Sequence, residues 1–245
     1  MNRETKLSLW SPSGRTSHFM PSSRTQFLTS SPTAMLMPML NVQVIDHPVI
    51  QTKLSELRDK STDTRTFRLL LDEIAMLMTY EVTRDWPTIK RPVSTPMEET
   101  QGAVLARPVT LVPVLRAGLG MADGVKRILS DARMGHLGVS RNEKTLQPDS
   151  YYAKLPPDVK ETEVLLIDPM LATGGSAVYA VEYLKQRGVT SMKFMCLVAA
   201  PEGIERLHLK HPEVPVYCCA IDRQLNDRGY IRPGLGDAGD RLFGT

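Results

Sequence analysis

The sequence predicts an α/β fold built on an open, mostly parallel β-sheet with helices on its faces. Four short runs have the apolar composition of buried strands: VTLVPVL (109–115), VLLI (164–167), MKFMCLVAA (192–200) and VPVYCCAI (214–221). Strands that are apolar at every position are typical of a parallel sheet covered on both sides. Helix-forming segments separate these runs, and such alternation of strand and helix is the sequence pattern of an open α/β sheet.

Two helices are expected before the sheet, at residues 50–59 and 64–82. In the second helix, apolar residues recur at intervals of three and four and form one face; they are Phe67, Leu70, Leu71, Ile74, Leu77 and Met78. Asp63 has a side chain suited to capping the start of this helix, and Trp86-Pro87 marks its end.

The middle of the chain continues this pattern. The strand at 109–115 leads into RAGLG (116–120), and a helical segment follows. MGHLGVSR (134–141) and SYYAKL (150–155) are typical of two strands, and the polar residues between them predict a long connecting arm.

The last third of the chain adds two predicted helices. SAVYAVEYLKQRG is the first, with Gly188 as its C-terminal cap, and PEGIERLHLKH is the second. Residues 226–245 are rich in Gly, Asp and Arg and show little regular pattern.

The positive charge of the chain lies at its start. The formal net charge is +3, and residues 1–38 hold four basic residues against one acidic residue, which leaves 26 of each sign in the remainder. This Ser/Thr/Pro-rich, acid-poor segment is expected to be a disordered tail, and residues 39–245 the folded domain. An organellar transit peptide is the alternative, because it has the same composition. The neutral remainder gives no support to nucleic-acid binding.

The composition also indicates in which cellular compartment the protein works. No run of about 18 apolar residues is present, so no membrane span is predicted. The three cysteines, Cys196, Cys218 and Cys219, are odd in number and lack metal-ligand spacing, which favours a reduced intracellular compartment. The expected location is the cytoplasm, with organellar targeting by the tail as the open alternative.

The loop DPMLATGGS (168–176) joins a buried strand to a helix and carries the first functional signal. Its small residues let backbone N–H groups approach an anion, and the Thr173 and Ser176 hydroxyls add donors. The lysine of a nucleotide-binding P-loop is missing. Asp168 would repel a phosphate but suits sugar hydroxyls or a magnesium ion. The loop therefore predicts a phosphorylated sugar, and a plain strand–turn–helix junction is the alternative.

Basic residues elsewhere offer further anion contacts. Arg116 ends another buried strand, where a guanidinium can clamp a diphosphate. Arg141 and Lys144 lie in or beside the predicted arm, which could close over an anionic substrate. From these residues alone, an exposed hairpin with solvated charges is the favoured interpretation of the arm.

Four segments, in this order along the chain, resemble the type I phosphoribosyltransferases in the branch that acts on uracil. VPVLRAGLGM (112–121) resembles their diphosphate loop and RNEKTLQP (141–148) their arm. DPMLATGGS resembles their loop for 5-phosphoribosyl diphosphate (PRPP), with Pro169 where the wider family usually has a second acid. YIRPGLGDAGDRLFGT (230–245) resembles their uracil-binding segment. The resemblance extends from about residue 40 to the end.

The resemblance implies a Rossmann-like sheet with a β-arm and a C-terminal hood. It implies transfer of the phosphoribosyl group from PRPP to uracil, giving UMP and diphosphate, with Mg²⁺ carried on PRPP and not ligated directly by the protein. The implied catalytic residues are Asp237, Arg141 and Arg116. The implied PRPP contacts are Arg116, Arg141, Asp168, Pro169, Met170, Leu171, Ala172, Thr173, Gly174, Gly175, Ser176 and Asp237. The implied uracil contacts are Ile231, Gly236, Asp237 and Ala238.

The chemistry of such a transfer fits these residue types. Displacement at the anomeric carbon develops positive charge on the ribose and negative charge on the leaving diphosphate, which Arg116, Arg141 and magnesium would stabilise. Asp237 would either accept the proton of the attacking nitrogen or stabilise charge on the ribose. Backbone groups of the Gly/Pro-rich segment would match the donors and acceptors of uracil.

The resemblance further implies a homodimer or homotetramer and GTP as an effector. Two other functions remain open on the sequence: a phosphoribosyltransferase for another base, and a regulatory protein of the same fold that binds PRPP or UMP. A domain linked to a uridine kinase is a third, although the chain contains no kinase P-loop motif.

Overall fold

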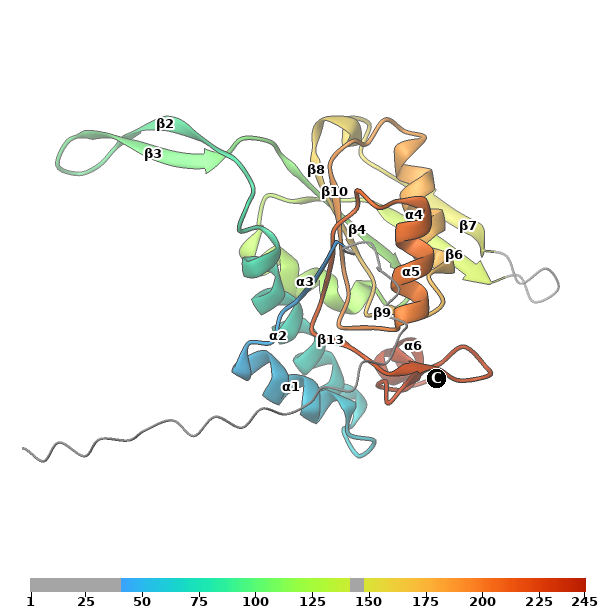
Figure 1. Cartoon of the computed structure of the whole chain (residues 1–245). Coiled ribbons are helices and arrows are strands. Elements are labelled where there is room, and N and C mark those ends of the chain that lie inside the picture. The colour runs from blue at the N-terminus through green and yellow to red at the C-terminus, as the bar shows by residue number, and fades with distance from the viewer. Residues whose placement is uncertain (1–40, 142–147) are drawn as a thin grey trace, which may run out of the picture. The chain divides into compact units, whose positions relative to one another are not determined.

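The computed structural model describes residues 41–141 and 148–245, and the predicted tail at 1–38 lies outside these ranges. The main element is an eight-stranded sheet of order β1-β12-β10-β8-β4-β6-β7, with β5 beside β4. Its strands are β1 (Val42–Val44), β4 (Val109–Leu115), β5 (Arg133–Met134), β6 (His136–Arg141), β7 (Pro148–Lys154), β8 (Glu163–Ile167), β10 (Met192–Met195) and β12 (Val216–Cys218). All pairings in this sheet are parallel except that of β6 with β7. The predicted open, mostly parallel sheet is confirmed (Figure 1).

Helices cover both faces of this sheet. On one face lie α1 (Pro48–Arg58), α2 (Thr64–Val82), α3 (Leu119–Ile128) and α6 (Ala238–Phe243), and on the other α4 (Gly175–Lys185) and α5 (Pro201–Lys210). Side chains of β8 alternate between the two cores: Leu165 and Ile167 join the first, Val164 and Leu166 the second. Because both faces are buried, residues 164–167 of the strand are all apolar, as the sequence predicted, and the charged Glu163 stands at its first position.

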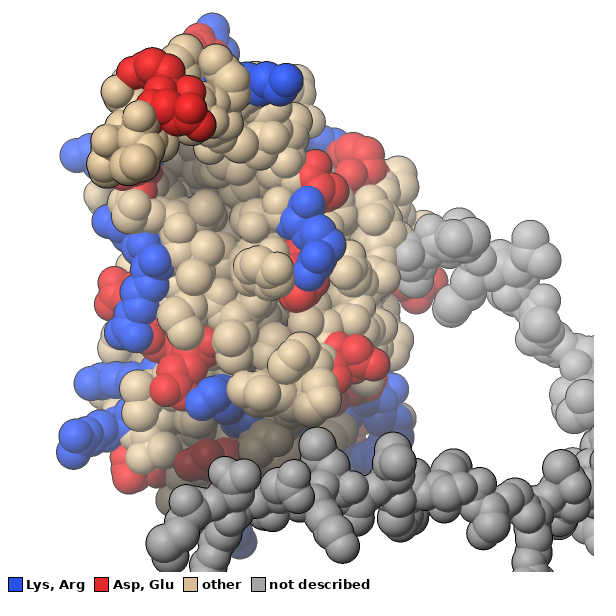
Figure 2. All heavy atoms as spheres, turned by 90° about the vertical axis from the view of Figure 1, so that its left-hand side faces the viewer, with Lys and Arg blue, Asp and Glu red and all other residues tan. Residues whose placement is uncertain are grey.

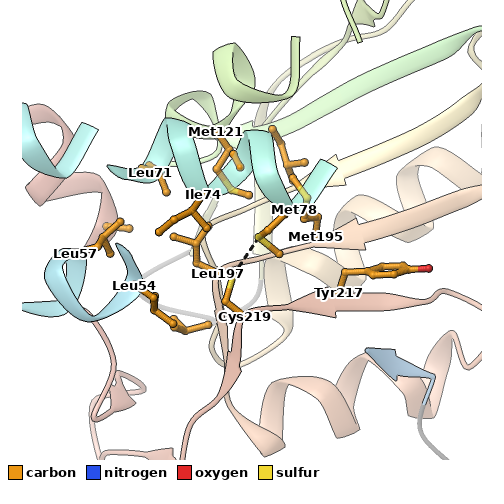
Figure 3. Close-up of a cluster of buried hydrophobic side chains, with 14 of the residues drawn as sticks. Leu54, Leu57, Leu71, Ile74, Met78, Met121, Met195, Leu197, Tyr217 and Cys219 are labelled. Carbon is orange, nitrogen blue, oxygen red and sulfur yellow. Dashed lines mark hydrogen bonds between the residues drawn. The ribbon is translucent and has the colours of Figure 1, made fainter. Parts of the chain in front are cut away.

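The core beneath α1 and α2 contains a sulfur contact (Figure 3). Cys219, which follows β12, donates its S–H to the Met78 sulfur of α2 at 3.2 Å. Cys196, Cys218 and Cys219 are all buried and free. These thiols are packing residues, and Figure 3 shows Cys219 among leucines and methionines from both the sheet and the helices.

Three strands of the sheet break at the same level. After each break the chain forms a second, three-stranded sheet of order β13-β11-β9, whose strands are β9 (Met170–Leu171), β11 (Val198–Ala199) and β13 (Ala220–Ile221). The predictions of unbroken strands at 192–200 and 214–221 were therefore wrong. The cause lies at Pro169, which has no N–H to donate to a ladder.

The carbonyl of Pro169 accepts hydrogen bonds from two successive N–H groups, those of Leu197 and Val198, at 2.9 and 3.2 Å. The Leu197 carbonyl in turn accepts from the N–H groups of Cys219 and Ala220 at 2.9 and 3.2 Å. The same hydrogen-bond pattern thus repeats from one strand to the next, and the three strands bend at the same level.

The first two helices agree with the prediction, since α1 and α2 begin and end within two residues of the expected ranges. Asp63 caps α2, and its side chain accepts a hydrogen bond from the Thr66 N–H at 2.8 Å. The antiparallel hairpin of β2 (Thr88–Ser94) and β3 (Glu99–Leu105) was not predicted. Nearly all its positions are exposed, so no alternation of buried and exposed residues marks it in the sequence. Figure 1 shows the hairpin extending away from the sheet.

The C-terminal segment is more regular than its composition predicted. β14 (Gln224–Leu225) and β15 (Ile231–Arg232) form an antiparallel pair, and α6 follows. Arg68 of α2 donates its Nε–H to the carbonyl of Leu242 at 2.5 Å, which ties α6 to the helical layer. Within the described residues, no helix is both long and apolar enough to cross a membrane.

The closest packing in the helical layer lies between α2 and α3. A Cβ atom at Gly124 would lie 2.0 Å from the carbonyl oxygen of Asp72, a contact that a backbone atom cannot avoid. We expect Gly124→Ala to destabilise the protein by about 2 kcal/mol or more, because overpacking outweighs the better helix propensity of alanine. Chemical denaturation measures this change.

The control for Gly124→Ala is Asp123→Ala, one position earlier in the same helix and exposed. It also gains helix propensity, although less than a glycine replacement does, and it brings no clash, so its free energy of unfolding should equal or exceed that of the wild type. Equal stability of the two variants would contradict the packing argument.

Candidate active site

Three segments meet at the carboxyl edge of the sheet, where ligands bind in open α/β folds. They are the loop after β4, the loop after β8 and the C-terminal segment. A Cβ atom at Gly118 would lie 2.6 Å from the Ile167 carbonyl oxygen, so the first two loops touch at the backbone. A Cβ atom at Gly239 would lie 3.8 Å from the Arg116 guanidinium and 3.2 Å from an Asp237 carboxylate oxygen. The predicted residues Arg116 and Asp237 are therefore neighbours.

Asp168 stands at the tip of β8, directly before the strand break. Its N–H donates to the Met195 carbonyl at 3.2 Å, and its carboxylate accepts from the Met170 N–H at 3.3 Å. Burial raises the pKa of Asp168 to about 7; the hydrogen bond from Met170 opposes the rise, and the negative charge of Asp237 adds to it. The two carboxylates thus share one electrostatic environment, and near neutral pH Asp168 exchanges between its charged and neutral forms.

The loop from Ala172 to Ser176 turns into the start of α4. Gly174 is the N-cap residue with φ +75°, and no side chain caps this helix. A Cβ atom at Gly174 would also lie 2.8 Å from the Gly203 carbonyl oxygen at the start of α5. Glycine is therefore required at Gly174 both for its backbone angle and for close packing. The first N–H groups of α4 have no partner within the helix, which leaves them for an anion.

Arg116 follows β4 through a cis peptide bond and is 57% exposed. Its guanidinium lies 3.8 Å from an Asp240 carboxylate oxygen and 5.5 Å from the centre of the Phe243 ring. Both partners belong to α6. The residue is thus held at the site by weak, exposed contacts that an anionic ligand can replace.

The predicted uracil contacts lie in and beside a turn at residues 233–237. Ile231 is 7% exposed and Ala238 is fully buried, and both side chains belong to the hydrophobic core. Gly236 has φ +83° and is exposed. Asp237 caps α6, with one carboxylate oxygen accepting the Asp240 N–H at 3.0 Å.

The predicted arm lies mostly outside the described residues. The backbone of Arg141 ends β6 and pairs with Pro148 of β7. The antiparallel pairing supports the predicted pair of strands, whereas the positions of Lys144 and of residues 142–147 as a whole are not described. The binding role assigned to Arg141 stays a prediction.

Sequence reasoning missed three polar residues near the site. Arg58 and Asp222 form a bidentate ion pair at 2.7 and 2.8 Å, with Asp222 only 7% exposed. Arg206 of α5 donates to the Thr173 carbonyl at 3.4 Å. Asp222 directly follows the apolar run at 214–221, as Asp168 follows that at 164–167. That shared position is the signal that could have identified it.

The site combines a helix N-terminus for a phosphate, an exposed arginine for a second anion and the carboxylates of Asp168 and Asp237 for a sugar. On an open parallel sheet, with these loops at its carboxyl edge, this arrangement defines the fold and site of a type I phosphoribosyltransferase. A family model described as uracil phosphoribosyltransferase matches residues 44–245.

Curated relatives agree with that match. A uracil phosphoribosyltransferase of Halalkalibacterium halodurans is 56% identical over 208 residues, covering 84% of this chain and all of the relative. One of Dictyoglomus turgidum is 56% identical over 205 residues, covering 83% and 99%. The solved AQ2163 protein of Aquifex aeolicus is 36% identical with a TM-score of 0.79, covering 82% and 97%. The chain belongs to the uracil phosphoribosyltransferase family.

The raised pKa of Asp168 has a consequence for stability. The carboxyl binds its proton more tightly in the folded state than in the unfolded state, whose value is near 3.8, so it destabilises the fold progressively as the pH rises from about 4 to about 7. Asp168→Asn removes this penalty. We expect the variant without ligands to melt several degrees higher than the wild type at pH 8 and at the same temperature near pH 4, measured by scanning calorimetry.

Asp158→Asn is the matched control. The hydrogen bond from Arg133 lowers the pKa of Asp158, so this carboxylate stabilises the fold above its usual pKa and the stabilisation is lost as the pH falls. Its replacement should lower the melting temperature at pH 8. A melting temperature of Asp168→Asn below that of the wild type at pH 8 would refute the electrostatic account of Asp168.

Proposed function

We propose that this enzyme transfers the 5-phosphoribosyl group of PRPP to uracil, giving UMP and diphosphate. The observation that carries the proposal is the convergence of Arg116, the 168–176 loop and the Asp237 turn at one edge of the sheet. The chain that makes this arrangement is more than half identical to proteins named for that activity.

The 5-phosphate of PRPP binds at the start of α4. The free N–H groups of that helix, the helix dipole and the hydroxyls of Thr173 and Ser176 supply the donors. Asp168, beside this loop, accepts hydrogen bonds from the ribose hydroxyls. A carboxyl with a pKa near 7 can also donate to them when it is protonated.

The diphosphate binds to Arg116, which exchanges Asp240 for the stronger charge of the ligand. This exchange holds the leaving group where its negative charge develops, and Arg141 adds a second cation from the arm. Positioning and electrostatics account for the rate, without a covalent intermediate.

Magnesium fits the site as a companion of PRPP. Asp168 and Asp237 bring two carboxylates to the same space, which repel each other unless a cation or a proton intervenes. When bound, Mg²⁺ neutralises the charge of the diphosphate. Among the described residues no group of three or more His, Cys, Asp or Glu side chains could hold a metal ion.

Uracil is recognised by backbone groups of residues 231–238. The exposed Gly236 lies within this segment, and the peptide groups of the segment are the donors and acceptors offered to the base. Cytosine presents an amino donor where uracil presents a carbonyl, so it leaves polar groups unpaired and is rejected.

A homo-oligomer, either dimer or tetramer, completes the proposal. The hairpin β2–β3 exposes Ile89 (55%) and Met97 (91%), and α2 exposes Tyr80 (63%). Figure 2 views the molecule from the side toward which the hairpin extends and shows a largely uncharged surface there, interrupted by basic and acidic side chains. A second copy would cover these apolar side chains, and light scattering of the enzyme in solution tests this.

GTP is proposed as an effector from the resemblance alone, and the activity assay with and without GTP tests it.

The decisive experiment is an assay of UMP formation from uracil, PRPP and Mg²⁺. Cytosine and hypoxanthine replace uracil in parallel reactions. Turnover with uracil alone is expected. Turnover with hypoxanthine instead would assign the enzyme to another base, and binding of PRPP or UMP without turnover would make it a regulatory protein.

Asp237→Asn separates chemistry from folding. Asparagine is as good an N-cap as aspartate, so α6 keeps its cap and the melting temperature should change little. The charge at the reaction centre is lost, and we expect kcat to fall about 100-fold or more. A near-normal kcat in steady-state kinetics would remove Asp237 from the chemistry.

Arg141→Ala tests the arm. Loss of a charge-assisted contact to the diphosphate should raise the KM for PRPP about tenfold, with the melting temperature unchanged. Lys144→Ala, in the same arm, is the comparison for a general loss of charge. If the kinetics for PRPP do not change in Arg141→Ala, the residue is a solvated charge.

A further inference from the structure

The buried ion pair of Arg58 and Asp222 touches the proposed uracil-binding turn at a single residue. Arg58 donates one hydrogen bond to each carboxylate oxygen of Asp222, at 2.8 and 2.7 Å. The same Arg58 donates to the Gly234 carbonyl at 2.7 Å, and the Gly234 N–H donates to Asp222 at 2.8 Å. Both polar backbone groups of Gly234 therefore bind to one ion pair.

The two charged residues come from elements outside the turn. Arg58 is the last residue of α1, and Asp222 follows β13 with its N–H bonded to the Ala199 carbonyl at 2.8 Å. Their side chains are 21% and 6% exposed. In such a position the hydrogen bonds are charge-assisted and poorly screened by solvent.

Gly234 is itself fixed against the first residue of the base-binding segment. Its φ is +66°, and a Cβ atom there would lie 2.2 Å from the Ile231 carbonyl oxygen. A displacement of Gly234 therefore displaces the backbone of Ile231. On the other side, the Leu235 carbonyl accepts from Arg241 at 2.8 Å, and Arg241 also donates to the Asp59 carbonyl at 2.6 Å.

We propose that Arg58 and Asp222 are positioning residues, which fix the backbone of residues 231–236 in the geometry that binds uracil and thereby set the affinity for the base. The inference deepens the proposed function and rests on it. Backbone recognition of a small planar base requires donors and acceptors held within a fraction of an ångström. Ile231 and Leu235 pack into the core, but Gly234 and Gly236 have no side chains, so hydrogen bonds must fix the backbone at Gly234.

Asp222→Asn and Arg58→Lys test the pair. The amide places a donor where an acceptor is needed, and lysine lacks the planar fork that reaches Asp222 and Gly234 together. We expect each variant to raise the KM for uracil about tenfold or more, while the KM for PRPP stays within about twofold of the wild-type value. Folding is verified at the assay temperature by scanning calorimetry.

Glu163→Gln is the matched control. Glu163 is 8% exposed and pairs with Arg107 at 3.2 Å, but it begins β8 at the opposite edge of the sheet from the site. Its replacement should lower the melting temperature and leave the KM for uracil unchanged. If the Asp222→Asn and Arg58→Lys variants fold and leave the KM for uracil unchanged, or raise both KM values equally, the positioning role is refuted.

A second measurement does not depend on catalysis. Amide hydrogen exchange of peptides covering residues 226–238 should be about tenfold faster in Arg58→Lys than in the wild type, with other peptides unaffected. Unchanged exchange would overturn the proposal. A wild-type enzyme that forms no UMP would refute the proposed function alone, because the exchange experiment would still decide whether the pair fixes the turn.

Discussion

The site depends on the missing N–H of Pro169. At that residue the ladder of the main sheet cannot continue, and the Pro169 carbonyl accepts two bonds from the neighbouring strand, which repeats the pattern toward the next strand. Three strands consequently leave the main sheet together and form a small second sheet. Asp168 lies at the first bend, and Asp222 follows the end of the last strand. One imino acid thus sets the positions of two carboxylates that are far apart in the sequence.

Close backbone contacts then position the ligand-binding loops relative to the bent strands. Gly118 lies against Ile167, and Gly174 lies against Gly203, in each case too close for a side chain. These contacts hold the loops as rigid bodies on the sheet. They also leave Asp168 buried, and this burial raises its pKa and disfavours its charged form while no ligand is bound. The enzyme therefore retains at its site a buried carboxyl whose charged form its substrate and magnesium are expected to stabilise.

Features that depend on burial were predictable from the sequence, and features that depend on contacts between distant segments were not. Apolar runs marked the strands around VLLI, and the helical period marked α2. The breaks in the strands at 192–200 and 214–221 left no signal, because residues on both sides of them are buried and apolar alike. The hairpin β2–β3 left none, because its exposed residues do not alternate. The anion-binding loop at 168–176 could be predicted because glycine, small residues and a helix start are local features of the sequence. The role of Asp222 could not be predicted, because its partners Arg58 and Gly234 lie 164 and 12 residues away in the sequence.

The difference between Asp168 and Asp222 shows what an acid at a strand tip can do. Both follow apolar strands of the same bent layer. Asp168 has no cationic partner among its bonds, so burial raises its pKa and leaves it available to a ligand. Asp222 accepts two hydrogen bonds from Arg58 and one from a backbone N–H, so its carboxylate oxygens bind to the protein itself and not to a ligand. A phosphorylated sugar, rich in hydroxyl and phosphate oxygens, is bound by groups such as Asp168 that remain available to a ligand. A neutral base is bound by backbone groups, and the Arg58–Asp222 ion pair fixes these groups at Gly234, where no side chain is present to pack.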